Sequence, residues 1–434
     1  MKPASGTTVI SHGQLILGTG ALPIPDGVVV IDEGRITYAG PAQGAPTVSP
    51  AARQIDARGG SILPGLIEAH YHPTYFNVAA LEDLDIKYPV EYVTLLAAHN
   101  CALALECGYT SARSGGSLFN IDVWLKKAIE NELVPGPRLA SSGREICGAG
   151  GLMDWNPDFR KIGMEGLVLL VNGADEARAA VRRLVKDGIE WVKTYPTGDA
   201  AAPDTNDHHT LCMTFEEMHA VVSTAHNHGM KVTGHCRATE GIKNALRAGY
   251  DAVEHATFLD DEALELLLAR NVPCVPALYF EYASIEEGPR FGMSQRVIDG
   301  HRETLEAGAE SARRIFRAGG CLGLGGDYGF AWNPHGNYAR ELTFFVEYVG
   351  LTPLEVITCA TKHGAMILGR QHELGTLEAG KLADVLVVPG DVLANIRLLE
   401  DRSQFIAVLQ GGAIRAGKEA RGGSITSNSA QAAS

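Results

Sequence analysis

The sequence lacks long hydrophobic runs and an excess of positive charge. Its apolar runs, such as 167–171 and 385–388, are far shorter than the roughly 18 residues that a membrane-spanning helix requires. There are 37 Lys and Arg against 51 Asp and Glu, which gives a formal net charge of −14. We therefore expect neither a membrane nor a nucleic-acid partner. Residues 1–25 have no apolar stretch typical of a secretory signal, which predicts a cytoplasmic protein.

Cysteines are also few and show no pairing pattern. None of the eight cysteines forms a Cys-x-x-Cys spacing, so the chain resembles neither a disulfide framework nor a zinc ribbon. We expect reduced and mostly buried thiols. With 45% hydrophobic and 20% charged residues, most of the chain has the composition of a folded globular protein.

A repeated unit dominates the sequence from about Asp175 onward. Each unit has an amphipathic stretch, usually a glycine, then a short apolar run and a residue that can bind a metal. The predicted helix–strand pairs are 177–187 with 189–193, 215–228 with 231–235, 240–248 with 250–255, 261–270 with 272–278, and 297–318 with 319–327. Upstream, 61–72, 108–114 and 136–142 complete a count of eight strands. Such alternation predicts an α/β protein, a (β/α)8 TIM-type barrel, with an open doubly wound sheet as the alternative.

Both ends of the chain differ from this pattern. They contain short β-type runs separated by Gly, Pro and Asp. We expect residues 1–58 and 372–420 to form a composite β-sandwich domain beside a barrel of residues 59–371. The last segment, 421–434, is mostly Gly, Ser and Ala and is expected to be a disordered tail.

Histidines and one aspartate mark the ends of the predicted strands. His70 and His72 are two residues apart, so both should point to the same face. For this pair alone, two hydrogen-bonded core imidazoles are an equally good explanation. However, a further set of residues also closes predicted strands, where a barrel gathers its catalytic groups: Lys193, His235, His255 and Asp327.

Four imidazoles and one carboxylate are typical ligands of a divalent ion. They suit zinc first, with cobalt or manganese as alternatives, better than calcium or magnesium. Lys193 does not fit this set, because an ammonium group would repel metal ions. Either a modification makes it anionic, or it does not bind the metal.

Several motifs resemble those of the amidohydrolase superfamily, and more narrowly its imidazolonepropionase-like, prolidase-like and ochratoxinase-like metal-dependent amidases. The resemblance spans nearly the whole chain and is carried by the segments Gly34–Gly40, Pro64–His72, Gly249–His255, Gly325–Asp327, Ala360–Thr361 and Leu374–Asp384. Three places depart from the family pattern: Glu68 stands where Asp is usual, Cys147–Gly150 replaces a His-containing glycine loop, and Cys236 and Arg237 are unusual after His235.

The resemblance implies a binuclear metal centre with a CO2-derived carbamate on Lys193. Lys193 would bridge the two ions, His70, His72 and Asp327 would hold one, and His235 and His255 the other. A metal-bridging hydroxide would attack the carbonyl group, with Asp327 as general base and acid. The expected reaction is hydrolysis of an amide-type C–N bond in an N-acyl amino acid, dipeptide, carbamate or xenobiotic amide.

Other functions remain open at this level. One is a mononuclear hydrolase or deaminase of a cyclic compound, in which Lys193 is structural; another is a lactonase. A non-enzymatic assembly protein on the same fold would lack metal ligands, and none is missing here.

Substrate contacts are predicted on the loops that follow the strands: Tyr195, Arg237 and His335. An arginine there favours a small-molecule substrate with a carboxylate, although a salt bridge within the loops explains Arg237 equally well. We also expect a homo-oligomer.

Overall fold

The structure is a computed structural model that describes residues 6–157, 159, 166–202 and 206–422. Within them, segments from both ends of the chain form one eight-stranded mixed sheet. Its strands are β1 (Thr7–Leu15), β2 (Ile24–Asp32), β3 (Arg35–Pro41), β4 (Arg53–Asp56), β5 (Ser61–Pro64), β15 (Val385–Val388), β16 (Ala407–Gln410) and β17 (Ala413–Ala416). The order is β17-β16-β15-β5-β1-β2-β3, with β4 paired to β1. The predicted disordered tail lies outside the described residues from residue 423 onward.

The remaining strands are parallel and form two further sheets. These strands are β6 (Leu66–Tyr71), β7 (Tyr109–Ser114), β8 (Arg138–Ala140), β9 (Glu145–Gly148), β10 (Val168–Val171), β11 (Trp191–Thr194), β12 (Lys231–Cys236), β13 (Ala252–His255) and β14 (Cys274–Val275). One sheet has the order β6-β7-β8 and the other β10-β9-β11-β12-β13-β14. All are parallel pairings, as expected when helices connect successive strands.

Backbone hydrogen bonds link the two parallel sheets at both sides. Ser141 O, directly after β8, accepts from Trp191 N of β11 at 3.0 Å. On the other side, segment 321–324 lies between β14 and β6. Cys274 N of β14 donates a hydrogen bond to one carbonyl oxygen of this segment at 3.0 Å, and Ala69 N of β6 donates to another at 2.9 Å. The carboxyl ends of strands from both sheets can therefore contribute to one site.

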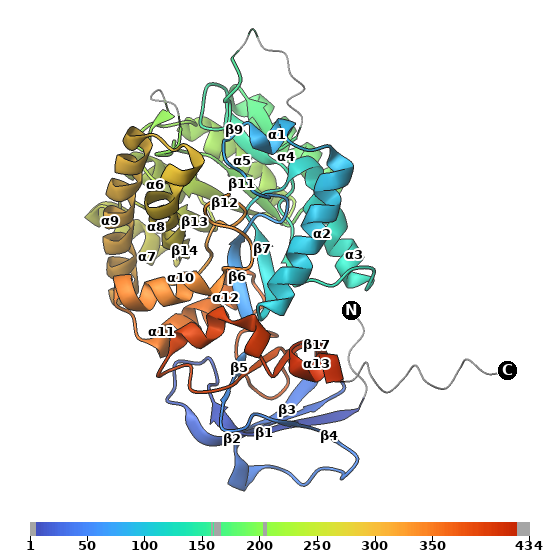
Figure 1. Cartoon of the computed structure of the whole chain (residues 1–434). Coiled ribbons are helices and arrows are strands. Elements are labelled where there is room, and N and C mark those ends of the chain that lie inside the picture. The colour runs from blue at the N-terminus through green and yellow to red at the C-terminus, as the bar shows by residue number, and fades with distance from the viewer. Residues whose placement is uncertain (1–5, 158, 160–165, 203–205, 423–434) are drawn as a thin grey trace, which may run out of the picture.

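Helices surround these strands in Figure 1, and the mixed sheet lies at one end of the molecule. The helices are α1 (Asp83–Ile86), α2 (Val90–Glu106), α3 (Ile121–Glu130), α4 (Ala174–Asp187), α5 (Phe215–Asn227), α6 (Thr239–Ala248), α7 (Asp261–Ala269), α8 (Leu278–Glu287), α9 (Gln295–Arg317), α10 (Ala339–Phe344), α11 (Pro353–Thr358), α12 (Gly364–Ile367) and α13 (Lys418–Gly422). The five helices predicted by the repeated unit, α4 to α7 and α9, are present within three residues of their predicted ends.

Three predicted strands were wrong in extent. The run 61–72 is divided into β5 and β6 at Gly65, where an added Cβ would lie 2.3 Å from the Thr110 side chain. The run 272–278 contains only the two-residue β14, because α8 already begins at Leu278. The glycine-rich run 319–327 forms an isolated bridge from Leu322 to Cys274 instead of a regular strand. Strands β9 and β10 were not predicted.

The cysteine prediction is confirmed, because all eight thiols are free and all but Cys321 are buried. Among the described residues, no helix has the length and hydropathy of a membrane span.

Candidate metal centre and substrate cavity

Histidines from three parallel strands meet at the carboxyl ends of those strands. His70 belongs to β6 and His72 follows it, while His235 and His255 belong to β12 and β13. The Nε2 atoms of His70 and His72 are 3.1 Å apart. The ring of His255 lies 5.3 Å from that of His70 and 4.5 Å from that of His235, between centroids. The structure thus brings together the four predicted histidines.

Asp327 joins this cluster from the segment that follows 321–324. Its Oδ1 lies 3.3 Å from His72 Nε2 and 3.9 Å from His70 Nε2. The backbone φ of Asp327 is +53°, which is uncommon for a residue other than glycine and is held here by a buried loop. In that loop the Asn333 side chain donates to Gly326 O at 2.8 Å. Burial raises the pKa of Asp327 to about 7, although the Lys193 charge opposes the shift.

Lys193 is buried beside the histidines and forms an ion pair with Glu254. The other oxygen of Glu254 accepts from Arg113 Nη2 at 2.7 Å. Although burial opposes it, the two cations lower the pKa of Glu254, so this carboxylate is ionised. Glu254 Oε2 also lies 3.9 Å from His70 Nε2. In this structure the Lys193 ammonium is therefore neutralised by a carboxylate within the site.

Sequence reasoning missed Glu254 because simple strand alternation places it on the face opposite His255. Instead, both residues approach His70. The backbone of His255 and Ala256 is left-handed, with φ of +68° and +46°, and this interrupts the alternation at the end of β13. The available signal was that Glu254 directly precedes a predicted metal ligand.

The donor atoms fit a divalent ion. His70, His72 and Asp327 form one group whose candidate ligand atoms lie within 4.8 Å of one another, and His70, Glu254 and His255 form a second. Burial lowers the pKa of His70, His72 and His255, which favours the neutral imidazole that metals bind. Two buried ring nitrogens, His70 Nδ1 and His255 Nε2, have no hydrogen-bond partner within the described chain.

His235 stands slightly apart from these two groups. Its Nε2 contacts Gly198 O at 3.1 Å and lies 3.5 Å from Asp199 Oδ2. Burial lowers the pKa of His235 to about 3, so it too is a neutral imidazole.

The three predicted substrate contacts occupy different environments. Tyr195 lines the cavity above the cluster, and its hydroxyl donates to Glu145 Oε2 at 2.5 Å. His335 contacts the hydroxyl of Tyr338 and the carbonyl oxygen of Tyr75, both at 2.9 Å, and does not line the cavity.

Arg237 is buried and paired on two sides. Its Nε donates to Asp199 Oδ2 at 2.5 Å, and its Nη2 lies 2.6 Å from Glu281 Oε1. Only 1% of the residue is exposed, and it does not line the cavity. This geometry corresponds to the salt-bridge explanation of Arg237, in which it holds Asp199 at the cavity wall.

Replacing Arg237 by Met is expected to lower the free energy of unfolding by about 3 to 5 kcal/mol, because Asp199 would remain buried without its cation and Glu281 would keep only its contact with His301. Although burial opposes it, Arg237 lowers the pKa of Asp199 in the folded chain. The contribution of Asp199 is therefore present above pH of about 4 and is lost as the pH falls through the lowered value. Urea denaturation between about pH 2 and pH 8 measures both effects.

The matched control is Arg302→Met, in which an exposed arginine loses its pair with Asp299. Its unfolding free energy should change by about 0.5 kcal/mol or less. Equal losses in the two variants would contradict a structural role for Arg237.

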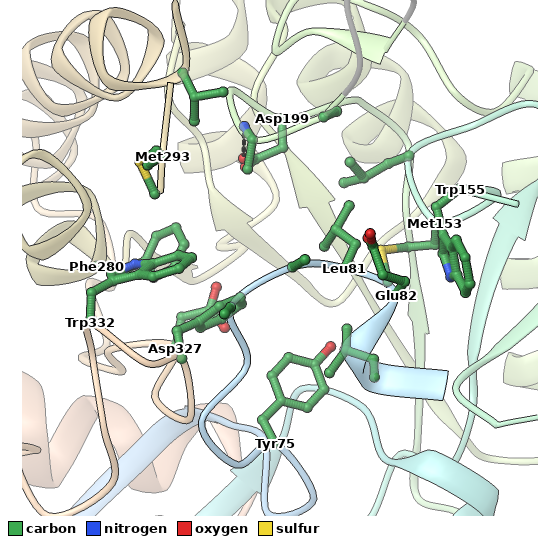
Figure 2. Close-up of a pocket in the computed structure, with 18 of the residues that line it drawn as sticks. Tyr75, Leu81, Glu82, Met153, Trp155, Asp199, Phe280, Met293, Asp327 and Trp332 are labelled. Atoms are coloured by element: carbon green, nitrogen blue, oxygen red, sulfur yellow. Dashed lines mark hydrogen bonds between the residues drawn. The ribbon is translucent and has the colours of Figure 1, made fainter. Parts of the chain in front are cut away.

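Above the cluster lies a cavity of about 450 Å³, shown in Figure 2. Asp199, Asp327 and Tyr75 contribute polar atoms to its lining, while most of its other residues are apolar. A cavity of this size and character is typical of a small-molecule site.

Comparison with known proteins identifies the family. The profile of the amidohydrolase family matches residues 61–415, so the chain belongs to this family. Ochratoxinase from Aspergillus niger is 28% identical over 437 aligned residues, covering 93% of this chain and 86% of that protein. Imidazolonepropionase from Symbiobacterium thermophilum is 26% identical over 429 residues, covering 89% of this chain and 92% of that protein.

Solved structures of prolidase-like proteins are similar over nearly their full length. A prolidase in complex with N-methylphosphonate-L-proline superposes with a TM-score of 0.85 at 27% identity, covering 94% of this chain and 99% of that chain. A Xaa-Pro dipeptidase with methionine in its active site gives a TM-score of 0.84 at 28% identity, with the same coverage. The resemblance inferred from the sequence motifs is therefore confirmed, and these relatives support hydrolysis of an amide bond.

Proposed function

We propose that this protein is a binuclear metal-dependent amidohydrolase that cleaves an amide-type C–N bond of a small molecule. One observation carries the proposal: imidazoles and a carboxylate from distant parts of an amidohydrolase chain converge at the floor of an apolar cavity. Ochratoxinase and Xaa-Pro dipeptidase among its relatives favour amide substrates over the cyclic substrate of imidazolonepropionase.

The proposed metal ligands are those that the family resemblance implies. His70, His72 and Asp327 would bind one divalent ion, and His235 and His255 the other, with zinc as the first choice and cobalt or manganese as alternatives. Lys193, carboxylated by CO2, would bridge them. Carboxylation would give Lys193 a negative charge. The buried guanidinium of Arg113, which pairs with Glu254, would offset this charge. When bound, such ions polarise a carbonyl group and lower the pKa of water towards neutrality.

Asp327 would move the proton in this reaction. Its carboxylate faces the histidine pair and the cavity, where it can reach both the attacking water and the departing nitrogen. Asp327 would accept a proton from the attacking water and deliver it to the departing nitrogen. Tyr195, held by Glu145, would contact the substrate from the cavity wall. We assign a positioning role to Arg237 and His335, because both side chains already form ion pairs or hydrogen bonds with other residues of the protein.

We further propose that β6, β7, β8, β11 to β14 and segment 321–324 close into a (β/α)8 barrel. The composite β domain would comprise 1–58 and 372–420, with 59–371 as the catalytic barrel. A homo-oligomer and a cytoplasmic location also remain proposals.

The function is tested by a hydrolysis screen of the zinc-loaded protein over N-acyl amino acids, dipeptides, carbamates and lactones. We expect release of an amine from at least one amide or carbamate. Turnover of lactones alone would overturn the amidase assignment, and deamination of a cyclic compound without amide turnover would favour the mononuclear alternative.

A further inference from the structure

We propose that the substrate carries a bulky apolar group on each side of the scissile C–N bond. This inference rests on the proposed function and specifies its substrate class. It comes from the two opposite walls of the cavity, which are built from different elements and are mostly apolar, although Glu82 and Arg296 also line the cavity.

The first wall, called the aromatic wall, is formed by Phe280, Phe291, Met293, Phe330 and Trp332. Its rings pack against one another: centroids are 4.8 Å apart for Phe280 and Phe330, and 5.4 Å apart for Phe330 and Trp332. Phe291 lies 6.2 Å from Trp332 and remains 44% exposed. An exposed aromatic ring beside a cavity, continuous with a buried aromatic cluster, is typical of a ligand contact.

The second wall, called the Trp155 wall, is formed by Leu81, Leu84, Leu152, Met153 and Trp155. It combines the segment around α1 with the loop that follows β9. The Trp155 indole nitrogen donates to Asp85 Oδ2 at 3.0 Å, which fixes the ring across these two segments. This wall therefore presents an ordered apolar surface.

Figure 2 shows how the walls lie relative to the proposed catalytic groups. Met293, Phe280 and Trp332 lie on one side of the cavity, and Leu81, Met153 and Trp155 lie on the opposite side. Asp327 and Tyr75 lie between them. A substrate whose carbonyl group approaches Asp327 consequently extends towards both walls, with its acyl part on one and its amine part on the other.

The size of the cavity agrees with such a substrate. About 450 Å³ is within the range of sites that enclose drug-sized molecules. Burial of an aromatic group on either wall should raise kcat/KM by about 10- to 100-fold relative to a substrate that lacks the group. A small dipeptide would leave both walls uncovered.

The inference is tested with four substrates that differ in two places and share the same carboxylate: N-(2-naphthoyl)phenylalanine, N-(2-naphthoyl)glycine, N-acetylphenylalanine and N-acetylglycine. We expect kcat/KM to fall by at least about 10-fold when either aromatic group is removed, and by about the product of the two factors when both are removed. Equal values for all four substrates, or faster turnover of N-acetylglycine, would overturn the inference.

Variants assign the two groups to the two walls. Trp155→Ala should reduce the preference for one of the aromatic groups, and Trp332→Ala the preference for the other. Because Trp332 is largely buried, the exposed Phe291→Ala is a second variant of the aromatic wall. Trp124→Ala, on α3 and 59% exposed outside the cavity, is the control and should change neither preference. Unchanged preferences in both wall variants would contradict the inference.

A binding measurement separates failure of this inference from failure of the proposed function. If the zinc-loaded protein hydrolyses none of the four compounds, calorimetric titration still compares their affinities. Tighter binding of N-(2-naphthoyl)phenylalanine than of N-acetylglycine, weakened by Trp155→Ala, would then support the walls, while the wider hydrolysis screen decides the proposed function. Equal affinities would reject the inference about the walls.

Discussion

Replacing Asp327 by Asn is expected to lower kcat by about 10²- to 10⁴-fold, with much of the metal retained. Asn keeps the size of the side chain but cannot accept a proton at neutral pH, whereas the carboxylate of Asp327 lies 3.3 Å from His72 Nε2 at the centre of the site. Steady-state kinetics together with metal analysis by mass spectrometry measure both quantities.

The control for this variant is Asp26→Asn, which changes an exposed carboxylate in β2 of the mixed sheet. It should have normal turnover. Near-normal turnover of Asp327→Asn in a metal-replete sample would refute its role as base.

Replacing Lys193 by Met is expected to reduce the bound metal from about two equivalents per chain to about one, and to lower kcat by at least about 10²-fold. The variant removes the proposed bridging ligand and also leaves Glu254 with Arg113 as its remaining cation. Metal analysis after dialysis and steady-state kinetics give the two results.

A surface lysine provides the matched control. Lys127→Met, on the exposed side of α3, should retain metal content and activity. One equivalent of metal in the wild type, unaffected by Lys193→Met, would support the mononuclear alternative instead.

The family and most helices could be predicted from the sequence because their signals are local. Helices α4 to α7 show the 3.6-residue period of buried apolar residues, and Gly188 and Gly249 end two of them in the left-handed conformation expected of a C-terminal glycine. The convergence of the proposed metal ligands could be predicted because each follows an apolar run at the end of a predicted strand. The structure brings the four histidines and Asp327 together as that pattern requires.

The interactions around those ligands could not be predicted, since they depend on residues far apart in the chain and on local backbone geometry. Arg113 and Glu254 are separated by 141 positions yet form a buried ion pair. Glu254 and His255 approach the same site although they are successive residues, because the backbone at His255 is left-handed, which no alternation rule reveals. Similarly, the sequence could not show whether Arg237 faces the substrate or Asp199, because that choice depends on how α8 and the loop after β11 pack around it.

The two cavity walls could not be predicted from the sequence for a related reason. The aromatic wall joins residues of α8 and its following turn to residues beyond Asp327, and the Trp155 wall joins the segment around α1 to the loop after β9. Each residue alone looks like ordinary core or surface. Only their arrangement around the proposed catalytic groups indicates a substrate class.

Anomalous X-ray diffraction at the zinc edge, from crystals grown with zinc and bicarbonate, tests the proposed metal centre most directly. We predict two peaks per chain, one bonded to His70, His72 and Asp327 and the other to His235 and His255, with extra density on Lys193 between them. A single peak, or peaks away from these side chains, would contradict the binuclear site.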